Sequence, residues 1–313
     1  MKFMMDIISP LTEDKNITLI KTIKTEEIIC DWQRYFNLDI REEINDKDEI
    51  YLYQCNKTKL LFYSPLDIAG SAKIYEELDK NDWYYMPNKW EHDMAIQDLK
   101  NCSKVLEVGC GRGDFVNRLR QESKIDAHGI ELNPSAVDYA IRKGIPVSQT
   151  DIYKLAKDGK GYFDAVCTFQ VLEHVAYPKS FLQALIELLK KNGKLIVSVP
   201  NSQSFIQYSQ NFLLDQPPHH MTRWCKETFY QMNDIFSLKV NKILLEPLAE
   251  YHVDWYIAIQ LSKWVSSLSE NRLFSSLSFR VFHELLKPML KQSPLIRGFI
   301  PGHTLYVCFE KMG

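Results

Sequence analysis

The sequence lacks several features that mark particular classes of protein. Its seven cysteines are scattered and form no C-x-x-C pair, so neither zinc-ligand spacing nor a disulfide framework can be read from them. No stretch of about 18 residues is both apolar and uncharged, and no basic start followed by an apolar run opens the chain. We therefore expect a cytoplasmic protein with reduced thiols, without a membrane span or a secretion signal.

The chain also lacks an excess of positive charge. Its formal net charge is -2, which provides no basic field for nucleic-acid phosphates, so a nucleic-acid partner is not expected. Internal repeats and low-complexity tracts are absent as well. What is present is ordinary globular composition, with 45% hydrophobic and 25% charged residues in a chain of 313, enough for one large domain or two modest ones.

The first 88 residues predict a small α+β unit. A helix is expected around 25–36, and residues 49–63 alternate between apolar and polar, with a polar centre at Asn56–Lys59 that suggests a hairpin turn. We interpret residues 1–88 as an N-terminal cap that precedes a larger domain at 89–313.

From Trp90 to about Leu245 the pattern alternates between short apolar strands and amphipathic helices. Strands are expected at 104–108, 126–131, 146–149, 164–169 and 194–199, with helices after Gly113, after Pro134 and at 179–191. Such alternation predicts an α/β fold with a Rossmann-like, doubly wound parallel sheet covered on both faces. Gly193 is predicted to be the C-cap that ends the 179–191 helix.

The last third of the chain predicts a helical insertion. A polar, proline-containing segment at 200–222 precedes a helix near 226–234, a strand near 237–245 and a helical stretch from about 251 to 292. The final strand, at 303–310, can return antiparallel beside 237–245. Residues 246–302 would then be a helical lobe inserted before the last strand.

A glycine-rich turn is the strongest chemical signal. The run V-L-E-V-G-C-G-R-G-D at 105–114 is a strand ending in a turn that opens a helix. Glycines at 109, 111 and 113 let the backbone bend sharply and approach a ligand, and the helix amino terminus offers unpaired N–H groups. This turn favours a nucleoside-bearing ligand, although a tight turn without a ligand would show the same glycines.

Two acids strengthen the ligand interpretation. Glu131 ends the second strand of the α/β region, 18 residues beyond Gly113, where a carboxylate can accept hydrogen bonds from both ribose hydroxyls. Asp151 follows the third strand and can accept a hydrogen bond from an adenine amino group. Either acid alone would more often be a solvated loop residue, but together with the turn they indicate a nucleoside site.

These motifs resemble those of class I S-adenosylmethionine-dependent methyltransferases, over about residues 90–245. The matching segments are E-x-G-x-G-x-G at 107–113, G-I-E-L-N around Glu131, Q-T-D-I around Asp151 and F-D-A-V-C-T-F-Q-V-L-E-H-V at 163–175. The resemblance implies S-adenosylmethionine as cofactor. The cofactor-binding residues that it implies are Glu107, Gly109, Gly111, Gly113, Glu131, Leu132, Asp151, Ile152 and Gln170.

A nicotinamide-dinucleotide site shares the strand, the glycines and the ribose acid. It fits less well, because the sixth position of its G-x-G-x-x-G pattern would be Asp114, which would place a carboxylate near a pyrophosphate.

Histidines follow the fourth and fifth strands of the α/β region. Q-V-L-E-H-V at 170–175 is similar to a segment of ubiquinone-type O-methyltransferases and makes His174 a candidate base, unless it only braces the next helix. Q-P-P-H-H-M-T-R-W at 216–224 is similar to a segment of methyltransferases encoded with bacterial sugar and surface-polysaccharide enzymes, and adds His219 and His220. Adjacent histidines in an extended segment should point apart, so we predict no metal site.

The resulting hypothesis is methyl transfer to a small-molecule acceptor. A hydroxyl of a sugar, sugar nucleotide or glycan-linked group is preferred, with one histidine among His174, His219 and His220 removing its proton. Alternatives are a quinone-like phenol, a nitrogen acceptor or a catalytically silent cofactor-binding module. Membrane contact through 251–300 is disfavoured against a helical lid or dimer face. Aromatic and aliphatic residues nevertheless interleave with basic residues there: Trp255, Tyr256, Ile259, Trp264 and Val265 with Lys263, Arg272, Arg280, Lys287, Lys291 and Arg297.

Overall fold

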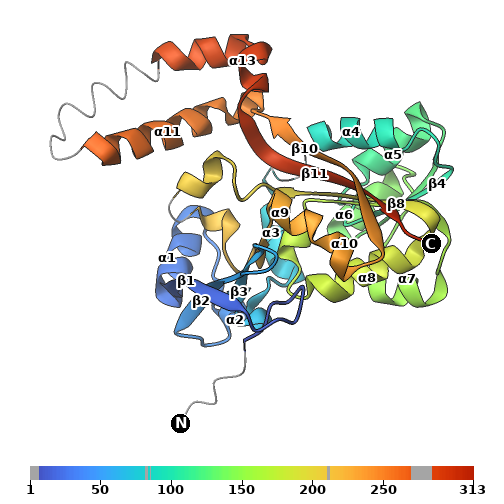
Figure 1. Ribbon diagram of the computed structural model, residues 1–313, viewed down its shortest axis with the longest axis horizontal. Helices are drawn as coiled ribbons and strands as arrows, with labels where there is room; N and C mark the ends of the chain where they lie inside the picture. The colour runs from blue at the N-terminus through green and yellow to red at the C-terminus, as the bar shows by residue number, and fades with distance from the viewer. Residues whose placement is uncertain (1–6, 82–83, 85, 210–211, 269–283) are drawn as a thin grey trace.

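The computed structural model describes residues 7–313 apart from 82–83, 85, 210–211 and 269–283, and the side chains of 264–268 lie outside the description as well. Figure 1 shows a central sheet flanked by helices, a smaller unit built from the N-terminal residues, and a pair of helical segments that extends away from both.

The central sheet has seven strands in the order β10-β11-β8-β7-β4-β5-β6. Strands β4 to β8 are parallel, and β11 runs antiparallel to both β8 and β10. Their bounds are β4 Lys104–Val108, β5 Asp126–Ile130, β6 Val147–Ser148, β7 Phe163–Phe169, β8 Leu189–Pro200, β10 Leu238–Pro247 and β11 Pro301–Lys311.

Helices cover both faces of this sheet because alternate strand residues point in opposite directions. In β4, Val105 belongs to one apolar cluster while Leu106 and Val108 belong to another on the opposite face. The helices are α4 Trp90–Asp98, α5 Asp114–Glu122, α6 Pro134–Arg142, α7 Ile152–Asp158, α8 Pro178–Leu188, α9 Lys226–Tyr230 and α10 Met232–Ile235. The predicted Rossmann-like, doubly wound fold is confirmed.

The N-terminal residues form a second sheet with its own apolar core. Its elements are β1 Ile17–Lys24, α1 Thr25–Phe36, α2 Arg41–Ile44, β2 Glu49–Cys55, β3 Leu61–Ser64 and α3 Ala72–Asp79. The predicted hairpin corresponds to β2 and β3. The fourth strand, β9 (Thr222–Arg223), pairs with β3 and comes from the histidine-containing segment after β8. This pairing fixes that segment between the two sheets.

The described residues between β10 and β11 form an inserted helical lobe, with α11 (Val253–Leu268), a helical stretch at 284–292 and α13 (Pro294–Gly298). Strands β10 and β11 pair antiparallel, as predicted, with Leu245 opposite Leu305. Within α11, Ile257 and Ile259 are buried against Phe205. The side chains of Trp264 and Val265 and all of Arg272 and Arg280 lie outside the described residues.

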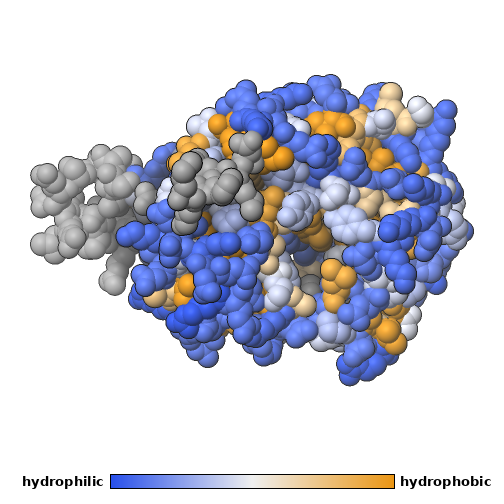
Figure 2. Space-filling view, turned by 90° about the horizontal axis from the view of Figure 1, so that it is seen from below, coloured by the Kyte–Doolittle hydropathy of each residue, from blue (hydrophilic) through white to orange (hydrophobic). Residues whose placement is uncertain are grey.

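Several charged residues of the lobe form ion pairs within it. Lys287 and Lys291 both pair with Asp254, and Arg297 pairs with Glu250. Among the described residues, none of the helices combines the length and the apolar character needed to span a bilayer. Hydrophilic residues cover most of the face shown in Figure 2, and hydrophobic residues form separate patches among them.

The predicted role of Gly193 is wrong. Helix α8 ends at Leu188, and Leu189 already pairs with Phe163 of β7, so the chain enters the sheet directly after the helix. Asn192, which is left-handed with φ 60°, and Gly193 both lie inside β8, where its pairing with β7 shifts register. Glycine is needed there because a Cβ atom would lie 2.9 Å from the carbonyl oxygen of Lys190.

Candidate active site

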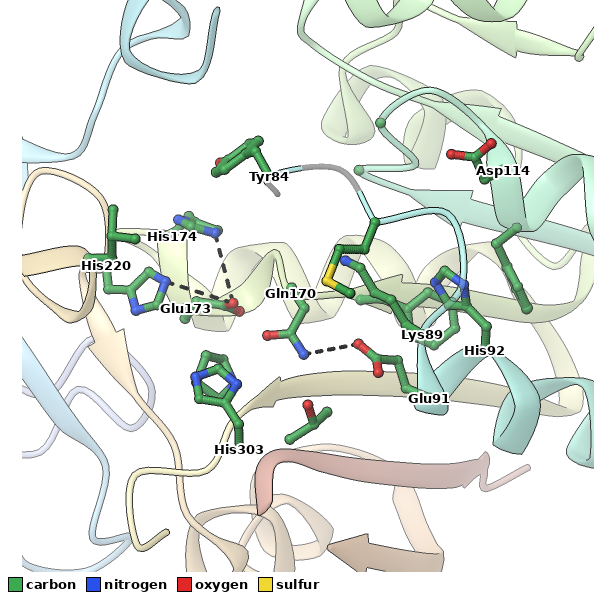
Figure 3. A pocket seen from close by; sticks show the side chains of 18 of the residues that line it. Tyr84, Lys89, Glu91, His92, Asp114, Gln170, Glu173, His174, His220 and His303 are labelled. Carbon is green, nitrogen blue, oxygen red and sulfur yellow. Dashed lines mark hydrogen bonds and ion pairs between the residues drawn. The ribbon is translucent and has the colours of Figure 1, made fainter. Parts of the chain in front are cut away.

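A cavity of about 310 Å³ opens at the carboxyl ends of β4 and β7. Figure 3 shows its two sides, with Asp114 and His92 near the glycine turn and His174 and His220 opposite them. Gln170 lies between the two groups. Because ligands of open α/β sheets bind at the carboxyl edge of the strands, this cavity is the expected place for a reaction site.

The glycine turn borders the cavity through its first two glycines. Gly109 and Gly111 line it, with φ values of 73° and 52°. A Cβ atom at Gly109 would lie 2.4 Å from Val171, so the turn also packs tightly against the segment after β7. Gly113 has φ 80°, and its Cβ would lie 2.9 Å from both Ile145 and Val147. Gly113 therefore lets α5 pack closely against the β6 region.

Glu131 holds the glycine turn in place. One carboxylate oxygen accepts a hydrogen bond from the Gly111 N–H at 2.8 Å, and the other accepts from Leu132 N–H at 2.7 Å and Asn133 N–H at 2.9 Å. Leu132 is exposed, and Glu131 is partly exposed at the end of β5. The residue thus lies next to the turn, at the edge where we predict the ribose.

Asp151 lies one strand further along the same edge, after β6. Its Oδ1 atom accepts hydrogen bonds from the N–H groups of Tyr153 at 2.8 Å and Lys154 at 3.0 Å, which caps the amino terminus of α7. Ile152 begins that helix and is buried. Both capping bonds use the same oxygen, so Oδ2 remains suited to accept from the adenine amino group that we predict.

Substitution of Asp151 separates these two roles. Asp151→Asn keeps a good capping oxygen, so the free energy of unfolding should change by less than about 0.5 kcal/mol. Asp151→Ala removes the cap and should lower the free energy of unfolding by about 1 kcal/mol. Both variants lose the second acceptor oxygen, and both should weaken S-adenosylmethionine binding about 10-fold in calorimetry. Unchanged affinity in Asp151→Asn would leave Asp151 as a helix cap only.

Two further predicted cofactor residues lie inside the cavity. Glu107 is buried, and its Oε2 atom has no hydrogen-bond partner among the described residues. Burial raises the pKa of this carboxyl well above its ordinary value. Gln170, with φ 55°, donates from Nε2 to Glu91 Oε1 at 3.1 Å. A buried carboxyl without a partner fits the positively charged amino group of S-adenosylmethionine, so Glu107 and Gln170 would hold its methionine part.

Three imidazoles form a cluster at the other side of the cavity, which we call the histidine cluster: His174, His219 and His220. Their ring centroids lie 4.5 to 4.8 Å apart. One nitrogen from each ring lies within 4.8 Å of the others. Glu173 is buried beside them, with Oε1 at 3.8 Å from His174 Nε2 and 4.0 Å from His220 Nε2 (Figure 3).

The hydrogen bonds of the cluster set the tautomer of each ring. His174 Nδ1 lies 2.7 Å from the His219 carbonyl oxygen, and His219 Nδ1 lies 2.8 Å from the Leu214 carbonyl oxygen. His220 Nδ1 lies 3.1 Å from Asp215 Oδ1. Because these oxygens accept, each Nδ1 must carry the proton, and in each neutral ring the lone pair is left on Nε2.

The expectation that His219 and His220 point apart is wrong. Their rings stack with centroids 4.6 Å apart and an interplanar angle of 18°. The segment is a turn and not an extended strand, since the N–H groups of both histidines donate to the carbonyl oxygen of Gln216. Consecutive side chains alternate in direction only when the backbone is extended.

Burial controls the charges in this half of the cavity. It lowers the pKa of His174 to about 4 and the pKa values of His219 and His220 well below their ordinary value, so the imidazoles are neutral near pH 7. Burial raises the pKa of Glu173 to about 8, and Glu173 Oε2 has no hydrogen-bond partner among the described residues. Asp215 is paired with Arg223, whose Nε lies 3.0 Å from Oδ2.

Sequence patterns missed several residues of this site. Glu173 stands inside the predicted motif but had no predicted role, and Asp215 stands five residues before its partner His220. The helical lobe and β11 contribute His252, Trp255 and His303 to the cavity wall. Phe212 lies beside Trp255, with ring centroids 4.8 Å apart and planes tilted by 42°. Adjacency to His174 was the available signal for Glu173, whereas no local pattern pointed to the lobe residues.

The fold and the edge of acidic, amide and glycine residues across β7, β4, β5 and β6 define a class I S-adenosylmethionine-dependent methyltransferase. A family model described as "Methyltransferase domain" matches residues 81–242, just over half of the chain. The chain belongs to this family. The predictions of enzyme class and of S-adenosylmethionine as cofactor are confirmed.

Curated relatives are similar over part of their length. A ubiquinone biosynthesis O-methyltransferase from Nitrosococcus oceani is 27% identical over 163 residues, covering 45% of this chain and 68% of that protein. One from Xanthomonas oryzae pv. oryzae is 34% identical over 121 residues, covering 37% of this chain and half of that protein. A solved S-adenosylmethionine-dependent methyltransferase from Archaeoglobus fulgidus is 20% identical with a TM-score of 0.47, covering 77% of this chain and 100% of the other.

Proposed function

We propose that this enzyme methylates a hydroxyl oxygen of a small-molecule acceptor. The observation that carries the proposal is that three neutral imidazoles, each with its lone pair on Nε2, line one cavity together with Glu173, across Gln170 from the glycine turn. A hydroxyl must lose its proton as the new C–O bond forms, and these groups can receive the hydrogen bond of that hydroxyl.

The positions of the predicted site residues support this orientation of the two substrates. S-adenosylmethionine supplies a methyl group activated by positive sulfur. Glu107, Gly109 and Gly111 line the cavity and would hold its amino-acid part. Glu131 with Leu132 would hold the ribose and Asp151 with Ile152 the adenine, further along the same edge of the sheet and outside the cavity lining. The histidine cluster would hold the acceptor oxygen on the far side of Gln170. Fixed alignment of the two substrates can account for several kcal/mol or more of the barrier, up to about 10 kcal/mol.

For the acceptor we propose a ring-shaped molecule, with a sugar, sugar nucleotide or glycan-linked group as the first choice. The cavity wall also carries Trp255 and Phe212, whose flat faces can pack on the apolar face of a ring. The second candidate is a quinone-like phenol, which the names of the curated relatives favour.

The test uses the purified full chain with methyl-labelled S-adenosylmethionine and paired acceptors. Each pair consists of a hydroxyl compound, either a sugar nucleotide or a catechol, and the analogue with an amine at the same position. We expect mass spectrometry and NMR to find the label on oxygen. Label on nitrogen would overturn the oxygen acceptor, and cofactor hydrolysis without any methylated product would favour a cofactor-binding module.

A further inference from the structure

The histidine cluster has an arrangement that direct contact with a hydroxyl does not require. Each ring is oriented from behind by a hydrogen bond from Nδ1 to a carbonyl or carboxylate oxygen, which leaves the lone pair on Nε2. The Tyr84 hydroxyl lies 3.4 Å from His219 Nε2, at the outer limit of a hydrogen bond. Imidazoles that bind metals are held in this way, with the second nitrogen donating to a carboxylate or backbone carbonyl.

Glu173 supplies a second, independent observation. Its side chain is 2% exposed and faces two of the three Nε2 atoms, at 3.8 and 4.0 Å. Its Oε2 atom has no hydrogen-bond partner among the described residues. A buried carboxyl oxygen without a partner costs free energy, and a bound cation would remove that cost.

We propose that the histidine cluster and Glu173 bind one divalent transition-metal cation, such as Zn²⁺, that holds the acceptor oxygen. Three imidazole nitrogens with one carboxylate suit Zn²⁺, Co²⁺ or Ni²⁺, whereas Mg²⁺ and Ca²⁺ prefer oxygen ligands. Bonds of about 2.1 Å would bring neighbouring ligand atoms to about 3.0–3.4 Å. The side chains would therefore close by about 1 Å around the cation.

The catalytic role of the cation rests on the proposed function, because it requires that the acceptor is a hydroxyl. Bound to the cation, the acceptor hydroxyl has a lowered pKa and releases its proton to water. The oxygen then forms the C–O bond as the C–S bond breaks, and sulfur keeps the electron pair. The three histidines would act as ligands in this step, and the predicted imidazole base becomes an alternative outcome of the test.

Cation binding can be measured without any acceptor. The full chain is freed of metals by dialysis against a chelator and is then titrated with Zn²⁺ or Co²⁺ in a calorimeter. Inductively coupled plasma mass spectrometry measures how many cations are bound per chain. We expect one cation per chain and visible absorption bands of Co²⁺ bound by nitrogen ligands. His174→Ala and His220→Ala should each weaken binding more than about 100-fold, and Asp215→Asn about 10- to 100-fold, because Asp215 only orients His220.

His128→Ala is the matched control, since His128 is an exposed histidine of β5 outside the cavity. It should bind the cation like the unchanged chain. Thermal unfolding shows whether each variant is folded, and His174→Gln and His220→Gln replace any that are not. Absence of stoichiometric binding, or equal binding in the cluster variants and in His128→Ala, would overturn the proposal.

Activity assays then test the metal site and the oxygen acceptor independently. Chelation should reduce hydroxyl methylation at least 100-fold while S-adenosylmethionine affinity stays within 2-fold, and adding Zn²⁺ or Co²⁺ should restore it. Full methylation by demonstrably metal-free enzyme would overturn the metal and favour a direct imidazole base. Stoichiometric cation binding with label found only on nitrogen would uphold the metal site and reject the oxygen acceptor.

Discussion

Replacement of Gly111 by valine is expected to abolish S-adenosylmethionine binding, with no heat detected in a calorimetric titration. Gly111 has φ 52°, a conformation that β-branched residues rarely adopt, and its backbone lines the cavity. Its N–H also donates to Glu131, so a distorted turn would lose that bond too. Glu131→Ala keeps the glycines but removes the carboxylate and its bond to the turn, and should weaken binding by about 1.5–3 kcal/mol.

Gly144→Val is the control that distinguishes the stability cost of a left-handed valine from the loss of cofactor binding. Gly144 has φ 71° and no atom within 4 Å of where its Cβ would lie, and it stands in the exposed turn after α6. The variant should lose about 1–2 kcal/mol of stability and bind the cofactor normally. Cofactor binding by folded Gly111→Val at unchanged affinity would remove the glycine turn from the cofactor site.

Single replacements in the histidine cluster should lower turnover about 100- to 10,000-fold while cofactor affinity changes little. We expect this because His174, His219 and His220 line the cavity, and His174 and His220 lie across Gln170 from Asp114, which follows the glycine turn. The loss should appear in kcat when each variant is compared with the unchanged chain at saturating cofactor and acceptor.

His128→Ala again provides the comparison, because it removes an imidazole that is exposed on β5. Its turnover should equal that of the unchanged chain. Near-normal kcat in all three cluster variants, with the native acceptor, would show that the acceptor is activated elsewhere. A nitrogen or carbon acceptor, or a base from the N-terminal unit, would then be the better account.

Short-range patterns are enough to predict the central sheet and the cofactor edge. Between Trp90 and Leu245, apolar residues recur with the period of a strand or of a helix, because side chains point in fixed directions in each. The carboxyl ends of parallel strands then lie at one edge of the sheet. For this reason Gly109, Glu131, Asp151 and Gln170 can be placed on that edge without coordinates. The errors are local, as at Gly193, where pairing of Leu189 with β7 overrides a glycine that looks like a helix end.

The acceptor half depends on contacts between segments that are distant in the chain. His174 follows β7, whereas His219 and His220 belong to a turn anchored by β9 in the N-terminal sheet. Asp215 orients His220 only because that turn brings the two side chains to 3.1 Å. Trp255 and His303 reach the same cavity from the lobe and from β11. The local sequence of a single strand or helix does not predict these contacts, because they depend on how the two sheets and the lobe pack together.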